Sequence, residues 1–347
     1  MFVFKKRQAM NVPQSIMDKI GRQLHNYENH PLAIIKGIIY SYFGDSFNKF
    51  DNLQPIVPVE ENFDALLIPK DHPARSLSDT YYVEENMVLR THTSAHQNEL
   101  MRQGERKFLV TGDVYRKDDI DATHYPIFHQ MEGVFISENM VDPEEDLKKT
   151  LKGLIDTLFP NCEWRLNNDY FPFTEPSFEV EVNFEGRWLE VLGCGIIHQD
   201  ILKNNNLSHC KGWAFGLGLE RLAMILFKIP DIRLFWSEDE RFINQFSSGK
   251  VITFKSFSSY PPTDRDIAFW ITDKFNGNDF SEMVRDLGND LVEQLSLIDS
   301  FKKGDRESRC YRIVYRSNER TLTNEEVNEI QKKIREEVVN RFGVEIR

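Results

Sequence analysis

Long apolar runs are missing from this sequence of 347 residues. No stretch of about 18 or more apolar residues occurs, so the sequence predicts no membrane-spanning helix. Cysteine is scarce, and the four residues are scattered along the chain as Cys162, Cys194, Cys210 and Cys310. They form no CxxC pair, and no histidine stands at a spacing that suits zinc. We therefore expect reduced thiols in an intracellular protein, and neither a disulfide framework nor a zinc site.

An excess of positive charge is missing too, since the formal net charge is −12. This value argues against nucleic-acid binding by bulk electrostatics but leaves room for a local basic face. Residues 254–347 carry 16 Lys and Arg against 18 Asp and Glu, so the acidic excess lies in the larger N-terminal part. The first 24 residues are basic, with Lys5, Lys6 and Arg7. They fit either the stub of an organelle-targeting peptide or a flexible basic N-terminus.

The N-terminal two thirds of the chain mix helical and strand patterns. Helical spacing predicts helices over 12–42, where Pro31 suits a first turn, and a further helix just after Asp142-Pro143. A segment rich in proline, around 51–80, is predicted to be mostly loop. Alternation over 178–184, a turn at Glu185-Gly186 and a second run over 188–192 predict a β-hairpin. Its acidic residues, Glu179, Glu181 and Glu190, are predicted to share one face, which is either solvated or a polar site.

The last ninety or so residues predict a separate small domain. The pattern gives a strand (266–271), a helix (279–290), a strand (291–300), a charged loop (302–309), a strand (310–316), a helix (323–341) and a last strand (343–347). This alternation is typical of a split βαβ, ferredoxin-like sandwich. We therefore predict an N-terminal extension over 1–24, a first domain over 25–242, a linker or hinge over 243–253 and a second domain over 254–347.

Three segments concentrate side chains that suit chemistry. Leu89-Arg-Thr-His-Thr-Ser-Ala-His96 is dense in hydroxyls and imidazoles, although a helix start with a Ser/Thr cap would look the same. Gly112 to Gly133 predicts two strands joined by a polar loop. Gly212 to Arg221 places glycines, which let backbone approach a ligand, before an arginine in the first turns of a helix. Taken singly, each segment also fits ordinary surface or salt-bridge residues.

Together these segments resemble motifs 2 and 3 of class II aminoacyl-tRNA synthetases, and more closely the catalytic chain of phenylalanyl-tRNA synthetases. The matching stretches occur in order over residues 12–347: Asn62-Phe-Asp64 with Asp71 to Arg75, Arg90 to Ser94, Gly112-Asp-Val-Tyr-Arg116, Phe128-His-Gln-Met-Glu-Gly133, Phe171-Pro-Phe-Thr-Glu-Pro176, Leu189 to Gly195 and Ala214 to Arg221. The C-terminal block, with Tyr260-Pro-Pro-Thr-Asp-Arg-Asp-Ile-Ala-Phe-Trp270, resembles the anticodon-binding domain of that family. Both parts on one short chain resemble its monomeric, mitochondrial form.

The resemblance implies an α+β fold, with an antiparallel-sheet catalytic core flanked by helices and a C-terminal ferredoxin-like sandwich. It implies activation of L-phenylalanine by ATP with Mg²⁺, and transfer to the 3′-terminal adenosine of tRNA-Phe for organellar translation in the mitochondrial matrix. Arg116 is expected on the α-phosphate, and Arg221 against adenine or the γ-phosphate. Phe128 is expected against the other adenine face, and Glu190 near the metal or ribose. No metal ligand is assigned.

The resemblance also implies the remaining substrate contacts. Phe171, Phe173 and Ala214 would form the phenyl pocket, and His92, Ser94, Gln130 and Glu132 would hold the amino and carboxylate groups. Further residues expected at the substrate site are Thr93, Ala95, His96, Ala122, Thr123, His124, His129, Met131 and Phe215. A basic group in the small domain, expected to contact tRNA, consists of Lys302, Lys303, Arg309, Arg312 and Arg316.

Other functions fit parts of the sequence. A non-catalytic, synthetase-like tRNA-binding protein would typically lack one of the two motif arginines, yet Arg116 and Arg221 are both present. A class II synthetase for another amino acid would share the fold, but Phe171 and Phe173 favour an aromatic substrate. An unrelated ATP-dependent ligase is the remaining alternative, because a fold does not fix a function.

Overall fold

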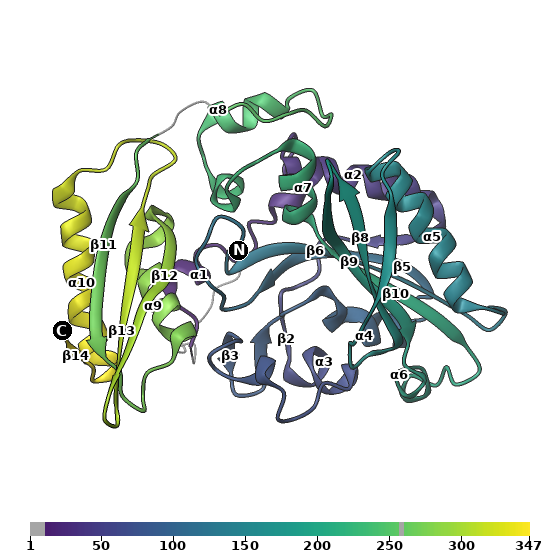
Figure 1. Cartoon of the computed structure of the whole chain (residues 1–347). Coiled ribbons are helices and arrows are strands. Elements are labelled where there is room, and N and C mark those ends of the chain that lie inside the picture. The colour runs from purple at the N-terminus through teal and green to yellow at the C-terminus, as the bar shows by residue number, and fades with distance from the viewer. Residues whose placement is uncertain (1–10, 257–259) are drawn as a thin grey trace.

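The structure is a computed structural model that describes residues 11–256 and 260–347. It confirms the predicted α+β class, with two large sheets that are mostly antiparallel and one short three-stranded sheet (Figure 1). The larger system belongs to the N-terminal part of the chain, and the smaller one is made by the C-terminal part. The basic residues Lys5, Lys6 and Arg7 lie outside the described residues.

The first domain is built on a sheet of seven strands in the order β1-β5-β6-β10-β9-β8-β7. β1 runs parallel to β5, and every other neighbouring pair is antiparallel. The predicted hairpin over 178–192 is confirmed, and its strands are longer than the sequence pattern suggested because both continue past the alternating core. The strands are β1 (Asn48–Phe50), β5 (Lys107–Tyr115), β6 (Ile127–Ser137), β7 (Trp164–Asp169), β8 (Thr174–Phe184), β9 (Arg187–Ile197) and β10 (Lys211–Gly218).

Helices cover one face of this sheet, and the predicted start signals are where they begin. α2 (Pro31–Phe43) has Pro31 in its first turn, and the His30 side chain accepts a hydrogen bond from the Leu32 amide. α5 (Pro143–Leu158) is capped by Asp142, which accepts from two backbone amides. These helices and α7 (Leu219–Phe227) bury their apolar sides against the sheet in the largest hydrophobic cluster. This face of the sheet is therefore core.

Smaller elements flank the opposite face and leave its centre uncovered by helices (Figure 1). A short sheet in the order β2-β4-β3 and several short helices pack there in a second cluster. The predicted loop over 51–80 is only partly loop, since it contains β2, α3 and two 3₁₀ turns. These elements are β2 (Ile56–Pro58), β3 (Tyr82–Glu84), β4 (Met87–Leu89), α3 (Val59–Asn62), η3 (Asp64–Leu66), η4 (Pro73–Arg75), η5 (Thr93–His96), α4 (Gln97–Arg102) and α6 (Gln199–Asn204).

The C-terminal unit is a four-stranded antiparallel sheet, in the order β12-β13-β11-β14, with two helices on one face. Its elements are β11 (Thr263–Trp270), α9 (Gly277–Gly288), η8 (Asn289–Leu291), β12 (Val292–Lys303), β13 (Arg306–Tyr315), α10 (Asn324–Phe342) and β14 (Glu345–Ile346). The prediction of a charged loop over 302–309 is wrong. The two strands continue through it as a hairpin, and only Gly304, at φ 60°, and Asp305 make the turn.

The connection between the two units is more structured than a linker prediction implies. It contains η6 (Ile232–Trp236), α8 (Glu240–Ile243) and η7 (Asn244–Phe246). Phe246, inside the predicted hinge, and Phe254, the residue that follows it, are buried in the first domain's core. A hinge over 243–253 stays a prediction, and such motion would have to respect these two anchors. At the N-terminus, α1 (Gln14–Met17) and η1 (Leu24–Asn26) also pack on that core through Ile16 and Leu24.

Candidate active site

The uncovered centre of the large sheet has a floor of glycines. Strand pairing puts Gly218 opposite Gln130, Gly216 opposite Glu132, and Gly193 opposite Gly216, so all of these residues share one face. A Cβ atom added at Gly216 or Gly218 would meet nothing within 4 Å. The floor is therefore open at these two positions, and a flat ligand can approach the backbone closely.

Glu132 is a buried acid at the edge of this floor. Its side chain is almost fully buried and forms a hydrogen bond with Ser94, while its Oε2 atom has no partner among the described residues. Burial raises the pKa of Glu132 to about 8. A buried carboxylate with a free oxygen is suited to an ammonium group, which would supply the missing hydrogen bond and charge.

Aromatic side chains line one side of the same region. The rings of Phe171 and Phe173 stack with centroids 5.8 Å apart, and Phe173 lies 6.2 Å from the ring of His92. Phe171 also covers the floor at Gly193, where an added Cβ would lie 2.8 Å from its ring. Ala214 shares this face and belongs to the same cluster as Phe173. The two sides of the site are thus an acid and an apolar wall.

His92 lies beside the ring of Phe173 and is a neutral imidazole. Burial, together with the nearby charge of Arg116, lowers the pKa of His92 to about 3. Its two ring nitrogens lack well-formed hydrogen bonds within the described part of the chain. An imidazole in this state can donate or accept a hydrogen bond without carrying charge.

Arg116 follows the last residue of β5, where the polar loop begins. Its Nε donates to the Thr91 carbonyl at 2.7 Å, and its guanidinium lies 5.2 Å from the ring centroid of Phe128 on the returning strand. No hydrogen bond from its two Nη atoms to a described residue is seen, so the guanidinium can offer further donors beside an aromatic ring. This pair can hold a phosphate next to a flat base.

Arg221 lies in the first turn of α7 and forms the opposite end of the floor. Its Nη1 is 3.2 Å from Glu190 Oε2, and both side chains are about half exposed. Glu190 is paired in register with Glu181, and Glu179 lies further along the same hairpin. Glu179 and Glu181 share a hydrogen-bond donor, since the Asn167 side chain donates to both carboxylates. The hairpin therefore presents carboxylates next to Arg221 of α7, and Glu190 and Arg221 are exposed to solvent.

The polar loop between Arg116 and Phe128 is folded on itself near its tip. The Asp121 carboxylate accepts from the amides of Thr123 and His124 and lies 2.7 Å from His124 Nδ1. The His124 and Thr123 side chains remain exposed, and the Ala122 carbonyl accepts from the Ile232 amide. His124 is thus reachable by a ligand, whereas Ala122 faces the connection to the C-terminal unit.

Several residues expected at the site lie away from the open face. His129, Met131 and Phe215 alternate with Gln130 and Ala214, so they point into the helix-covered core. Thr93, Ala95 and His96 are buried in or beside η5, and neither η5 nor α4 has a side-chain cap. We leave these residues out of the ligand contacts proposed below. The period of two along a strand is the signal that separates Gln130 and Glu132 from His129 and Met131.

The sequence reasoning missed two buried polar pairs next to the site, an arginine–carboxylate ion pair and a hydrogen-bonded carboxylate–imidazole pair. Arg90 Nη2 donates to Asp113 at 2.9 Å, and an added Cβ at Gly112 would lie 2.0 Å from that same nitrogen. Glu220 accepts from both the backbone amide and the ring Nδ1 of His129, at 2.7 Å each. In the sequence, the only signals of these pairs were Gly112 and the acids Asp113 and Glu220, which stand within apolar runs. Their partners could not be identified, because they lie far apart along the chain.

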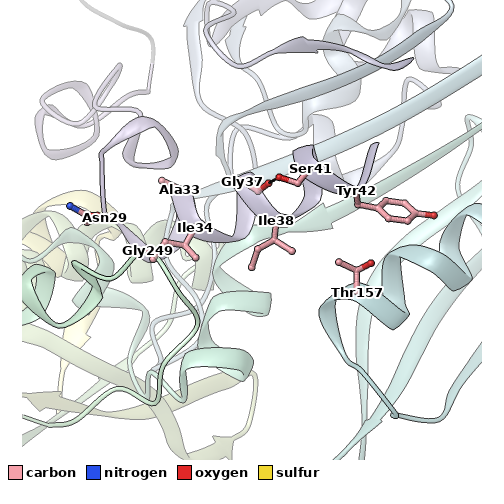
Figure 2. Close-up of a pocket in the computed structure, with 9 residues that line it drawn as sticks. All are labelled: Asn29, Ala33, Ile34, Gly37, Ile38, Ser41, Tyr42, Thr157 and Gly249. Atoms are coloured by element: carbon pink, nitrogen blue, oxygen red, sulfur yellow. Dashed lines mark hydrogen bonds between the residues drawn. The ribbon is translucent and has the colours of Figure 1, made fainter. Parts of the chain in front are cut away.

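The surface groove in Figure 2 is a different feature. It has a volume of about 730 Å³ and runs along α2, from Ile34 beside Gly249 at one end to Tyr42 near Thr157 of α5 at the other (Figure 2). None of the residues that line it belongs to the predicted site, and none carries a charge. The catalytic candidates are therefore gathered on the open sheet face and not in this groove.

The basic residues expected to contact tRNA are divided between different surfaces. Arg312 lies on the open face of the C-terminal sheet, where it donates twice to Asp266 at 2.8 Å. Arg316 is at the boundary with the first domain and pairs with Glu293 at 3.1 Å. Lys302 and Arg309 point to the helix side of the hairpin, where Arg309 pairs with Glu307, while Lys303 is exposed. The five residues thus form no single patch.

Comparison with known proteins matches both units to described families. Residues 15–246 match the family described as tRNA synthetases class II core domain (F), and residues 258–347 match the ferredoxin-fold anticodon binding domain. The fold and the site therefore define a class II aminoacyl-tRNA synthetase core joined to an anticodon-binding module. No helix in the described part of the chain is long and apolar enough to cross a membrane.

Individual relatives narrow the family. The phenylalanine–tRNA ligase of Arabidopsis thaliana, named chloroplastic/mitochondrial, is 54% identical and covers 97% of this chain and 82% of its own length. The mitochondrial phenylalanine–tRNA ligases of Dictyostelium discoideum and Mus musculus are 45% and 44% identical, over 97% and 96% of this chain and 89% and 85% of their own lengths. The chain belongs to the organellar, single-chain phenylalanine–tRNA ligases.

Proposed function

We propose that this chain activates L-phenylalanine with ATP on the open face of the large sheet and then charges tRNA-Phe. The observation that carries the proposal is Glu132, whose unpartnered buried oxygen lies on the same face as the aromatic wall and the open glycine floor. The ammonium of the substrate would bind Glu132 and Gln130, and its ring would rest against Phe171 and Phe173. Edge-to-face or stacked rings would add about 0.5–1.5 kcal/mol each beyond burial.

In the first step, a carboxylate oxygen of phenylalanine attacks the α-phosphorus of ATP. The bond between the α-phosphorus and the oxygen that bridges to the β-phosphorus breaks, and pyrophosphate leaves with its electron pair. Arg116 would stabilise the charge on the α-phosphate, since a planar guanidinium can donate two parallel hydrogen bonds. Phe128 and Arg221 would enclose the adenine, and the exposed His124 would reach the phosphates. In the second step, a ribose hydroxyl of the terminal adenosine, the 2′-OH by resemblance, attacks the carbonyl and AMP leaves.

Magnesium would arrive with the phosphates of ATP. Among the described residues, no group of three or more His, Cys, Asp and Glu side chains could hold a metal ion. Mg²⁺ does not require such a group, because it is commonly held by substrate phosphates with one or two carboxylates. Glu190 and Glu179, on the exposed hairpin, are the acids we propose to reach the ion or its waters. The ion would neutralise phosphate charge during the attack.

The tRNA contact is proposed on the open face of the C-terminal sheet. Trp270 and Phe301 lie there with ring centroids 6.3 Å apart, and Phe301 is nearly half exposed. The guanidinium groups of Arg306 and Arg347 lie 4.6 Å and 5.5 Å from these rings. Exposed aromatics beside arginines stack on unpaired bases and hold phosphates, which suits an anticodon loop. We propose this surface in place of the basic group first expected.

The setting follows from the family. We propose that the chain acts in organellar translation, in the mitochondrial matrix, because its relatives are named mitochondrial. We also propose that it acts as a monomer. The apolar pocket discriminates poorly against an added hydroxyl, by about 10²-fold, so weak activation of tyrosine is expected.

The test is amino-acid-dependent ATP–pyrophosphate exchange with all twenty amino acids and without tRNA. We expect exchange to be strongest with phenylalanine and measurable with tyrosine at high concentration. Absence of exchange with every amino acid, in folded protein that binds tRNA, would favour the non-catalytic alternative. Strongest exchange with an aliphatic amino acid would contradict the aromatic wall.

A further inference from the structure

The polar loop between Arg116 and Phe128 is held at residues 117–120 by contacts with the C-terminal unit. We propose that these contacts position the loop for amino-acid activation. The proposal rests on the function proposed above. It adds a role for the anticodon-binding module in a reaction that does not involve tRNA. The residues concerned lie between Arg116 and Phe128, the two groups proposed to hold the α-phosphate and adenine.

The C-terminal unit contacts the loop at four successive residues. Lys117 Nζ lies 3.0 Å from Asp279 Oδ1 on α9, and the Lys117 side chain is almost fully buried. The carbonyls of Asp118 and Asp119 both accept from Arg285 Nη2, at 3.0 and 2.8 Å. The next residue, Ile120, is buried in the hydrophobic cluster of the C-terminal unit and not in that of its own domain.

A backbone hydrogen bond completes this set of contacts. The Leu295 amide on β12 donates to the Ile120 carbonyl at 3.0 Å. Beyond the loop tip, Tyr125 donates through its hydroxyl to Asp290 at 2.7 Å. Together these contacts hold both ends of the loop, while its tip at Thr123 and His124 remains exposed. We call the contacts of Lys117 to Ile120 with α9 and β12 the loop latch.

Arg285 is the central residue of the latch. It is buried, and besides the two loop carbonyls it donates to Glu282, which also accepts from Tyr81 of the first domain at 2.7 Å. A buried guanidinium bound to carbonyls is costly to displace, because the carbonyls would be left without donors. The loop is thus fixed from a separate domain, as Figure 1 shows by the position of α9 against the first domain.

Among the described residues, those proposed to form the phenylalanine pocket all belong to the first domain. Glu132 and Ala214 are on strands of the large sheet, and Phe171 and Phe173 are placed by the β7–β8 connection of the same domain. Releasing the latch should therefore weaken the interaction with ATP and leave the interaction with phenylalanine unchanged. A general loss of stability would affect both substrates, so the contrast separates positioning from folding.

The experiment compares Arg285→Ala, Arg285→Lys and Ile120→Ala in the full chain by pyrophosphate exchange. We expect Arg285→Ala and Ile120→Ala to raise KM for ATP about five- to tenfold, equivalent to about 1–1.4 kcal/mol, with KM for phenylalanine unchanged. Arg285→Lys should recover part of the loss, since an ammonium can still reach one carbonyl. Arg335→Ala is the matched control, because that exposed arginine lies on α10, away from the first domain (Figure 1).

Hydrogen exchange at the Leu295 amide reports docking independently, because this amide is bonded to the loop. Faster exchange at Leu295 together with a raised KM for ATP would support the proposal. Faster exchange with an unchanged KM for ATP would overturn it, and so would an Arg285→Ala/Ile120→Ala double variant that changes neither. Wild-type protein without any pyrophosphate exchange would instead contradict the proposed function, so the two failures are distinguishable.

Discussion

The two larger sheets of this protein each have one face buried under helices and one open face, yet their open faces differ in chemistry. The open face of the large sheet has glycines at its centre, with buried Glu132 and partly buried Arg116 at its edges. The open face of the C-terminal sheet carries aromatic rings, and its exposed Arg312 is paired with Asp266. A small ligand is recognised by desolvated groups at fixed positions, whereas an RNA loop requires an accessible surface. The difference indicates which surface should tolerate substitution and which should not.

The largest effect is expected for Arg116→Ala. Removing a donor aimed at charge that develops in the transition state should lower kcat of pyrophosphate exchange by about 10²–10³-fold. Arg116→Lys should remain strongly impaired, because an ammonium cannot reproduce the fork. Binding of tRNA, measured by filter retention, should stay unchanged. Retention of more than about a third of the wild-type kcat would contradict the role given to Arg116.

Removing the aromatic pair of the C-terminal sheet should have a smaller and more selective effect. Loss of stacking is worth about 1–3 kcal/mol per base, so Trp270→Ala/Phe301→Ala should lower kcat/KM for tRNA charging at least about tenfold. Pyrophosphate exchange without tRNA should be unaffected. A parallel loss in both assays would mean that the double variant disturbs the first domain instead of the RNA surface.

Because Glu132 is buried, we expect the affinity for phenylalanine to depend on pH, whereas tRNA binding by the C-terminal face should lack this dependence. Burial raises the pKa of Glu132 to about 8, so below that pH the empty site holds a neutral carboxyl and must lose a proton to bind an ammonium. Affinity for phenylalanine should rise with pH toward about 8, up to tenfold per unit. Equilibrium binding across pH 6–8 measures the slope, and Glu132→Gln should bind weakly with a flat profile. A flat wild-type profile would contradict the protonation of Glu132.

The same group makes an opposite contribution to stability. The pKa of Glu132 is higher in the folded protein than in the unfolded chain, so the folded state binds the extra proton between the ordinary glutamate pKa of 4.5 and about 8. Its contribution to the unfolding free energy therefore falls as pH rises through that range. Glu132→Gln should remove this slope. Urea titrations at several pH values in the absence of phenylalanine provide the measurement.

Gly216 and Gly133 lie on opposite faces of the β6–β10 strand pair, so substitutions there test the two faces separately. Gly216→Ala should leave the unfolding free energy nearly unchanged, because its Cβ would meet nothing within 4 Å, but it should weaken ligand binding about tenfold. Gly133→Ala should destabilise the protein by about 1–3 kcal/mol, because its Cβ would lie 2.2 Å from the Phe215 ring. Thermal melts and pyrophosphate exchange separate the two outcomes. A destabilised Gly216→Ala variant would mean that the floor is not open.

The smallest effect is expected for Arg312→Ala. This exposed arginine is paired with Asp266 and lies 3.6 Å from Asp264, so its charge is already offset by acids. Exposed pairs of this kind contribute little, and tRNA charging should change by no more than about threefold. Charging measured at low and high salt checks this. A loss comparable with that of the aromatic double variant would return the basic strand to the centre of the RNA surface.

Local patterns predicted much of the fold. The start of α2 at Pro31, the Asp142 cap of α5, the 178–192 hairpin and the helices of the C-terminal unit all depend on neighbours within a few residues. The turn at Gly304 was missed because its flanks are charged and resemble a loop. Pairing with the neighbouring strand, and not propensity, keeps those residues extended.

The site was predictable in its parts but not in its arrangement. Short motifs predicted Arg116, Glu132, Phe171 and Arg221 as candidates, and strand periodicity could have separated His129 and Met131 from the residues of the open face. The glycine floor could not be found in this way, because Gly193 and Gly216 face the site only after three distant strands pair. The same holds for Arg90 with Asp113, and for the contact of Arg285 with the loop.

The sequence by itself determined the two domains, most helices and strands, and the residue types needed for adenylation, since these depend on short-range spacing and side-chain chemistry. The tertiary structure decided which face each residue occupies, and therefore that His129 supports the core while Gln130 lies on the open face of the sheet. It also decided that Ile120 belongs to the core of another domain. Burial, pKa shifts and contacts between distant residues arise only when the chain has folded, because they depend on neighbours that the linear order does not contain.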